Sequence, residues 1–230
     1  MVGLEEVHMR RLFLTIAMVW LAGFQGAAQD PVKVGPAEFK VEVENDLVRV
    51  LRVKRAAHAK SPLHEHPAAV VVYLTDLRVK VHGADGSVQD VTRKKGQAAF
   101  NPATKHAEEN VSDQPLEAIL IELKAGPGAR LPLPLDAVKV DPKHNIVEIE
   151  NERVRVIRIV REPHAKMPLH EHGRYVSVAL TDVGSKTTFP DGTTRENRRK
   201  AGEVGWRDPV KHAIENLGDQ RMEEIQVEIK

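Results

Sequence analysis

The sequence predicts an all-β protein built from two tandem barrels of similar size, and three observations support this. Residues 30–124 and 136–230 align without a gap at an offset of 106, and 44 of these 95 positions are identical. An internal repeat of this length indicates two copies of one structural unit. Both copies alternate apolar and polar residues at a period of two, the spacing of a strand with one buried face. Turn signals separate these segments at regular intervals, as in β-sandwiches and barrels.

The strands predicted for the two copies follow the same order. Residues 41–55 and 147–161 show the clearest alternation, and residues 69–76 and 175–182 are rich in the β-branched residues typical of strands inside a sandwich. No window keeps the 3.6-residue period of an amphipathic helix over three turns. Turns are predicted at Ala84 to Gly86, Pro190 to Gly192, Gly96 and Gly202.

The repeat also divides the chain into four segments. Residues 1–28 are predicted to be a secretory signal peptide, because Arg10 and Arg11 precede a short apolar run and small residues follow it. An uncleaved N-terminal anchor is the alternative, and either Met1 or Met9 is the start of translation. Residues 29–124 form the N-terminal barrel, residues 125–135 a linker rich in Pro and Gly, and residues 136–230 the C-terminal barrel.

Composition narrows the possible function. The formal net charge is +1, from 34 basic and 33 acidic residues, so no electrostatic surface for nucleic acid is expected. The protein is not expected to stay inserted in a membrane after signal cleavage, and its location would be secreted or periplasmic. The chain has no cysteine, which excludes thiolate metal sites, thiol catalysis and disulfides. Any metal must therefore be bound by nitrogen and oxygen ligands.

Histidines are the polar residues that the two copies share most conspicuously. Each copy carries an H-x-H pair, and a third histidine follows about forty residues later: His64, His66 and His106 in the first copy, His170, His172 and His212 in the second. Side chains two apart on a strand point to the same face, so each pair offers two imidazoles to one point. Imidazole ligates Fe, Mn, Ni, Cu and Zn, so we expect one divalent transition metal ion per copy. Passive copying of surface or core histidines is the alternative.

These motifs resemble those of the cupin superfamily, and the tandem arrangement resembles a bicupin. PLHEH at 62–66 and 168–172 matches the H-x-H of the first cupin motif. Gly96, His106 and Asn110 match the second motif, as do Gly202, His212 and Asn216 in the other copy. The resemblance covers the whole mature chain. It implies two double-stranded β-helix (jelly-roll) barrels, and it implies that the three histidines of each copy ligate one metal ion.

The sequence departs from the cupin pattern in two ways. The glutamate ligand of the family would fall near Val70 or Val71, and near Val176 or Ser177, so neither copy has a carboxylate there. The predicted site is therefore formed by three histidines alone.

The glycine that opens the first motif is replaced by His58 and His164. Each of these could be an additional pocket residue, a fourth ligand or a general base, or else a solvated turn residue. Glu108 alternates onto the face of His106 and is a further pocket candidate or a rim carboxylate, and its counterpart in the second copy is Ile214.

Two functions remain open at this point. The first is an exported bicupin with a divalent metal in each barrel that acts on a small organic molecule, as a dioxygenase-like oxidoreductase or an isomerase would. The second is a non-catalytic protein of the cell envelope that binds a small ligand or a metal. The sequence does not decide whether the protein is an enzyme, and a homo-oligomer is possible in either case.

Overall fold

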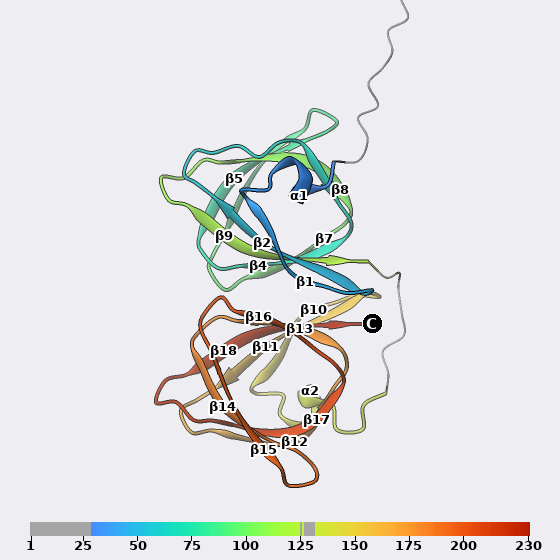
Figure 1. Cartoon of the computed structure of the whole chain (residues 1–230), viewed down its shortest axis with the longest axis vertical. Coiled ribbons are helices and arrows are strands. Elements are labelled where there is room, and N and C mark those ends of the chain that lie inside the picture. The colour runs from blue at the N-terminus through green and yellow to red at the C-terminus, as the bar shows by residue number, and fades with distance from the viewer. Residues whose placement is uncertain (1–28, 125, 127–131) are drawn as a thin grey trace, which may run out of the picture.

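The computed structural model describes residues 29–124, 126 and 132–230, and shows two barrels of the same topology stacked along the long axis (Figure 1). The predicted signal peptide lies outside the described residues. Each barrel combines a five-stranded and a four-stranded sheet whose strands pair antiparallel. The prediction of an all-β fold is confirmed.

The N-terminal barrel contains nine strands. In spatial order, its five-stranded sheet comprises β1 (Phe39–Glu44), β2 (Val48–Arg55), β9 (Leu116–Leu123), β4 (Ala69–Tyr73) and β7 (Ala98–Asn101). Its four-stranded sheet comprises β3 (His64–His66), β8 (Thr104–Asn110), β5 (Leu77–Gly83) and β6 (Val88–Arg93).

The C-terminal barrel repeats this arrangement strand for strand. Its five-stranded sheet comprises β10 (Asn145–Glu150), β11 (Val154–Arg161), β18 (Met222–Ile229), β13 (Tyr175–Ala179) and β16 (Val204–Arg207). Its four-stranded sheet comprises β12 (Lys166–His172), β17 (Val210–Asn216), β14 (Val183–Thr188) and β15 (Thr194–Arg199).

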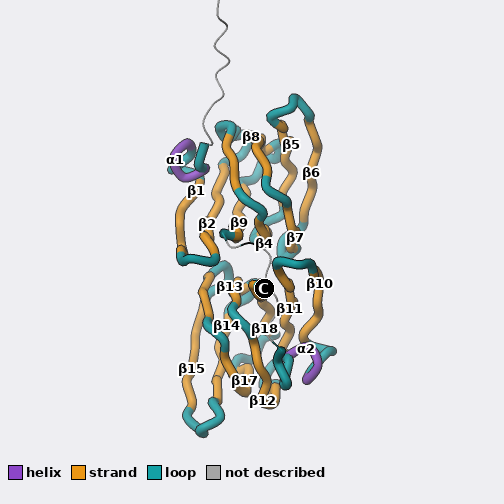
Figure 2. The backbone as a smooth tube through the Cα atoms, turned by 90° about the vertical axis from the view of Figure 1, so that its right-hand side faces the viewer, coloured by secondary structure: helices purple, strands orange, loops and turns teal. Residues whose placement is uncertain are grey.

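The two five-stranded sheets pack against each other and share one apolar core. In β9, Ile119 and Ile121 belong to this inter-barrel core, together with Ile225 and Val227 of β18. The alternate residues of β9, such as Leu120, face the interior of their own barrel. These strands are therefore buried on both faces, which explains why β9 is a nearly continuous apolar run. The four-stranded sheets lie at opposite ends of the molecule (Figures 1 and 2).

Reciprocal hydrogen bonds across this interface show a pseudo-two-fold relation between the barrels. The Arg52 guanidinium donates to the carbonyl oxygen of Gly202 at 2.7 Å, and Arg158 donates to that of Gly96 at 2.6 Å. Both glycines have positive φ angles, +83° for Gly96 and +87° for Gly202, as their predicted turns require. Matched residues thus fix the orientation of one copy relative to the other.

Two short helices are additions to the predicted fold. They are α1 (Pro31–Val34) and α2 (Ala137–Val140), and each begins after an aspartate whose carboxylate accepts a hydrogen bond from the N–H group of the second helical residue. Four residues are too few to produce a helical period in the sequence. Among the described residues, neither helix is long or apolar enough to cross a membrane.

Candidate metal centres and ligand cavities

Strand pairing brings the three predicted histidines of the N-terminal barrel together. His64 lies directly opposite His106 in the antiparallel ladder between β3 and β8. His66 is two residues beyond His64, so it points to the same side, while Glu65 between them is exposed. Ligand atoms of the three histidines all lie within 4.8 Å of one another. The H-x-H motif and the distant third histidine therefore form one group.

The C-terminal barrel contains the matching group. His170 pairs with His212 in the ladder between β12 and β17. His172 completes the group, again with ligand atoms within 4.8 Å of one another. The Nε2 atoms of His170 and His212 approach to 3.1 Å. Two imidazole nitrogens this close together can bind the same metal ion.

Backbone carbonyl groups orient the imidazoles. Nδ1 lies 2.9 Å from the Pro62 carbonyl oxygen in His64 and 2.8 Å from that of Pro168 in His170. A carbonyl oxygen can only accept a hydrogen bond, so Nδ1 carries the proton and the lone pair is left on Nε2. The His172 Nδ1 faces a carboxylate oxygen of Glu228 at 3.4 Å, which favours the same tautomer.

Burial keeps several of these histidines neutral. It lowers the pKa of His106 and His170 to about 4 and that of His212 to about 3, and it also lowers the pKa of His64. Neutral imidazole is the form that ligates metal ions. Three imidazoles whose ligand atoms lie within 4.8 Å of one another fit a divalent transition metal, and three ligands leave coordination positions for water or a small molecule.

The N-terminal histidine group opens onto a cavity of about 420 Å³, here called the N-terminal cavity. Its wall is mainly apolar and includes Val71, Val79 and Leu120. One arginine, Arg93, and one carboxylate, Glu108, are the only charged residues among those that line it, so their formal charges cancel.

Glu108 lies in this cavity rather than solely at its rim, and it is part of an ion-pair network. Its carboxylate is 2.8 Å from Arg55 and 3.8 Å from Nε2 of His106. Burial alone would raise the pKa of Glu108, but the adjacent Arg55 guanidinium lowers it below the ordinary value. Arg55 is also 2.8 Å from Glu38, so its buried charge is neutralised from two sides.

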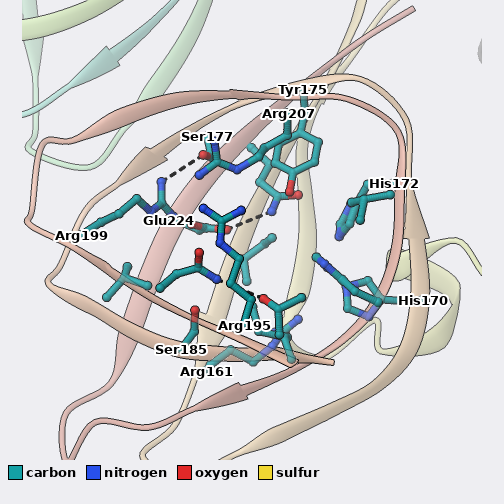
Figure 3. A pocket seen from close by; sticks show the side chains of 18 of the residues that line it. Arg161, His170, His172, Tyr175, Ser177, Ser185, Arg195, Arg199, Arg207 and Glu224 are labelled. Atoms are coloured by element: carbon teal, nitrogen blue, oxygen red, sulfur yellow. Dashed lines mark hydrogen bonds and ion pairs between the residues drawn. The ribbon is translucent and has the colours of Figure 1, made fainter. Parts of the chain in front are cut away.

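The C-terminal histidine group opens onto a cavity of about 320 Å³, here called the C-terminal cavity (Figure 3). Six positions that are apolar in the N-terminal cavity are polar here. The matched pairs are Val71 and Ser177, Val79 and Ser185, Val81 and Thr187, Val91 and Asn197, Ala118 and Glu224, and Leu120 and Gln226. Two barrels of the same fold thus enclose chemically different cavities.

Four arginines line the C-terminal cavity: Arg161, Arg195, Arg199 and Arg207. Figure 3 shows Arg195 and Arg199 across the cavity from His170 and His172. Only two carboxylates, Asp208 and Glu224, line the same cavity, which leaves an excess of positive charge.

Arg199 is held in place by side chains of the C-terminal barrel. It donates to the Ser177 hydroxyl at 2.9 Å and pairs with Glu224. This contact neutralises one of the four arginines.

The sequence motifs did not reveal these arginines, nor Glu224. The available signal was the set of positions at which the two copies differ, because apolar residues facing the interior of one barrel are replaced by polar residues in the other.

His58 and His164 do not line either cavity. Their side chains are 65% and 64% exposed, and Nε2 of each approaches a partner carboxylate, Asp113 at 2.9 Å and Asp219 at 3.0 Å. Both have φ of +58°, the left-handed region that favours glycine. This backbone geometry accounts for the glycine of the cupin motif at this position, and the solvated turn residue is the alternative that the structure has.

The positions of the missing family glutamate are also accounted for. Val70 and Val176 belong to the inter-barrel core, whereas Val71 and Ser177 line the two cavities. No carboxylate therefore enters either histidine group from this strand.

Comparison with known proteins supports the same architecture. No protein-family model and no curated protein match the sequence. The structure of AerE from Microcystis aeruginosa matches with a TM-score of 0.62 and 14% identity, over 84% of this chain and 91% of that chain. Oxalate decarboxylase from Bacillus subtilis matches with a TM-score of 0.56 and 13% identity, over 84% of this chain and 74% of that chain. At these identities the likeness concerns the fold, and both structures are cupin-fold proteins. Together with one histidine group per barrel, they show that the chain folds as a bicupin, as the sequence resemblance predicts.

Proposed function

We propose that this protein is an exported bicupin that binds one divalent transition metal ion in each barrel and takes a small organic molecule into the cavity beside it. The observation that carries the proposal is the convergence of three buried histidines, twice in the chain, at the wall of a cavity of 320 to 420 Å³. Cavities of this size are typical of small-molecule sites.

The chemistry of the histidine groups supports a functional metal more than a structural one. The histidines lie outside the inter-barrel core, and structural zinc sites are usually closed by four protein ligands. A bound metal would act as a Lewis acid, or as a redox centre if it is iron or manganese. The chain itself orients the imidazoles, and burial favours the neutral form of His64, His106, His170 and His212.

Metal content tests this proposal directly. Protein purified without a metal-affinity tag, stripped with chelator and reconstituted with Mn²⁺, Fe²⁺, Co²⁺, Ni²⁺, Cu²⁺ or Zn²⁺ in turn, is expected to bind two ions per chain by elemental analysis. His64→Ala and His170→Ala should each remove one ion. His58→Ala is the matched control, because this histidine is exposed and lies outside the cavity.

Two results would overturn the proposal. One is a folded wild-type protein, verified by circular dichroism, that retains none of these metals at stoichiometric levels. The other is an equal loss of metal in His58→Ala and His64→Ala. A protein that binds both ions but turns over no small molecule would instead fit the non-catalytic envelope protein.

Export is a separate part of the proposal. It is supported by the charged and apolar pattern of residues 1–28 and by the start of the repeat directly after it. Intact mass measurement of protein from the periplasmic fraction should give a chain beginning near residue 29. An unprocessed chain that stays with the cytoplasmic fraction would contradict it.

A further inference from the structure

The two barrel interiors differ more than their shared fold requires. Ten buried residues form an apolar cluster inside the N-terminal barrel, whereas the corresponding cluster of the C-terminal barrel contains three. The six apolar-to-polar differences described above all face the C-terminal cavity. Polar side chains inside a barrel cost stability unless they are hydrogen-bonded. Several of these side chains bond one another, as Asn197 does with Thr187 and Gln226 with Glu224, and together they give this cavity a polar wall that suits a polar ligand.

Arg161 is the clearest sign of what that ligand carries. Its counterpart Arg55 pairs with two carboxylates, Glu38 and Glu108. The second copy replaces these carboxylates with His144 and Ile214, so among the described residues Arg161 has no ion pair within 4.0 Å.

The remaining contacts of Arg161 do not neutralise its charge. Nη1 donates to the backbone carbonyl groups of His144 and Val160, and Nη2 donates to the Asn145 side chain and to the Met167 sulfur. Nε is buried without a hydrogen-bond partner. Burial lowers the pKa of Arg161, which reflects the cost of desolvating this cation, and the nearby charges of Asp141 and Glu224 offset that cost only in part. An anion in the cavity would reduce that cost.

Other arginines extend the positive surface. Arg195 and Arg199 are four residues apart on β15, so both lie on the side that faces the cavity. Arg198 lies between them in the sequence, points to the other side of the strand and does not line the cavity. Arg195 is exposed and makes no ion pair within the described part of the chain, so its guanidinium is available to a ligand. Guanidinium groups bind carboxylate and phosphate oxygens through paired, charge-assisted hydrogen bonds.

We propose that the C-terminal cavity binds a small oxyanion, a carboxylate or a phosphate group, between Arg161, Arg195 and the histidine group, whereas the N-terminal cavity does not. The inference rests on the proposed function for the location of the ligand beside the metal site. It adds the class of ligand, and it makes the two barrels different in specificity. The charge balance supports it, because the arginines outnumber the carboxylates only in the C-terminal cavity.

Calorimetric titration of the full mature chain tests this inference. The protein is first stripped with chelator, so that the result does not depend on whether the histidines bind metal, and it is titrated separately with succinate and with inorganic phosphate at low ionic strength. We expect one site per chain for at least one of the two anions, with the tighter one identifying the chemical source. The affinity should fall as salt is added, because the contacts are ionic.

Three variants localise the site. Arg195→Gln introduces the residue of the other copy at an exposed position, and it should weaken binding about tenfold through the loss of a charge-assisted hydrogen bond. Ile214→Glu places beside Arg161 the carboxylate that the first copy has, and it should abolish binding. Arg198→Gln removes the same charge from the same strand on its outer face, and it should bind as the wild type does.

Three results would overturn the inference. These are the absence of binding for both anions, two equivalent sites per chain, and equal affinities of Arg195→Gln and Arg198→Gln. None of them bears on metal content, which tests the proposed function separately. Conversely, a chain that binds the anion but no metal would contradict the proposed function and leave the anion site standing.

Discussion

Replacing Glu108 with isoleucine, the residue of the second copy, tests how the N-terminal barrel stabilises its buried arginine. The Arg55 side chain is fully buried, and its Nη1 donates to Glu108 at 2.8 Å. Its Nη2 is already without a partner. Glu108→Ile therefore leaves Glu38 as the single carboxylate paired with this guanidinium.

The expected destabilisation follows from these contacts. A hydrogen bond to a charged group contributes about 1.5 to 3 kcal/mol. The Glu108 side chain is 27% exposed, which places the loss toward the lower end of this range. The apolar isoleucine also recovers part of the lost free energy through its own burial. We expect the free energy of unfolding to fall by about 1 to 2 kcal/mol.

Urea unfolding of the chelator-stripped protein measures this change, read as a shift in midpoint at constant slope. Glu109→Gln is the control, because Glu109 pairs at 3.1 Å with a lysine that is 69% exposed, and such pairs contribute about 0.5 kcal/mol. Equal midpoints for the two variants would refute the reasoning that Arg55 depends on Glu108.

Two other predictions concern the histidine groups and the inter-barrel core. Metal-free protein should lose stability as the pH falls from about 6.5 toward 4, because the unfolded chain takes up protons that the folded chain does not, at about 1.4 kcal/mol per pH unit for each histidine whose pKa is lowered. Urea midpoints at pH 7, 6 and 5 check this, and a midpoint that stays constant would be inconsistent with buried neutral histidines. Ile225→Ala should cost about 3 kcal/mol, since this side chain is fully buried in the core shared by both barrels, and thermal unfolding should show both barrels melting in one transition. Val88→Ala, at a position 56% exposed, should change stability by less than about 0.5 kcal/mol, and a similar loss in both variants would show that the shared core is not what holds the barrels.

The architecture and the histidine groups could be predicted from sequence because they depend on periodic or repeated features. A period of two places His64 and His66 on one face wherever the strand lies. The repeat then identifies His106 and its counterpart as the third members. Pairing of His64 with His106 across the ladder realises this prediction.

The remaining features of the site could not be predicted by the same reasoning. Whether Arg161 is neutralised depends on which side chains surround it, and these come from segments far apart in the sequence. Similarly, the positive φ of His58 directs its side chain to the surface, although its position beside the motif made a pocket role plausible. A residue-by-residue comparison of the two copies would have been the best available guide, since identical positions include the ligands and differing positions include the cavity walls.

The interface between the barrels has a consequence for how the sequence of such a molecule can evolve. If the same two barrels were separate but identical subunits, every substitution would alter both interiors at once, because a single coding sequence would specify both. Joining the copies in one chain removes that coupling, while the reciprocal contacts of Arg52 and Arg158 preserve the way the two halves dock. One interior can then keep an apolar lining while the other acquires arginines. The unchanged interface between the barrels thus allows two separate specificities within one polypeptide.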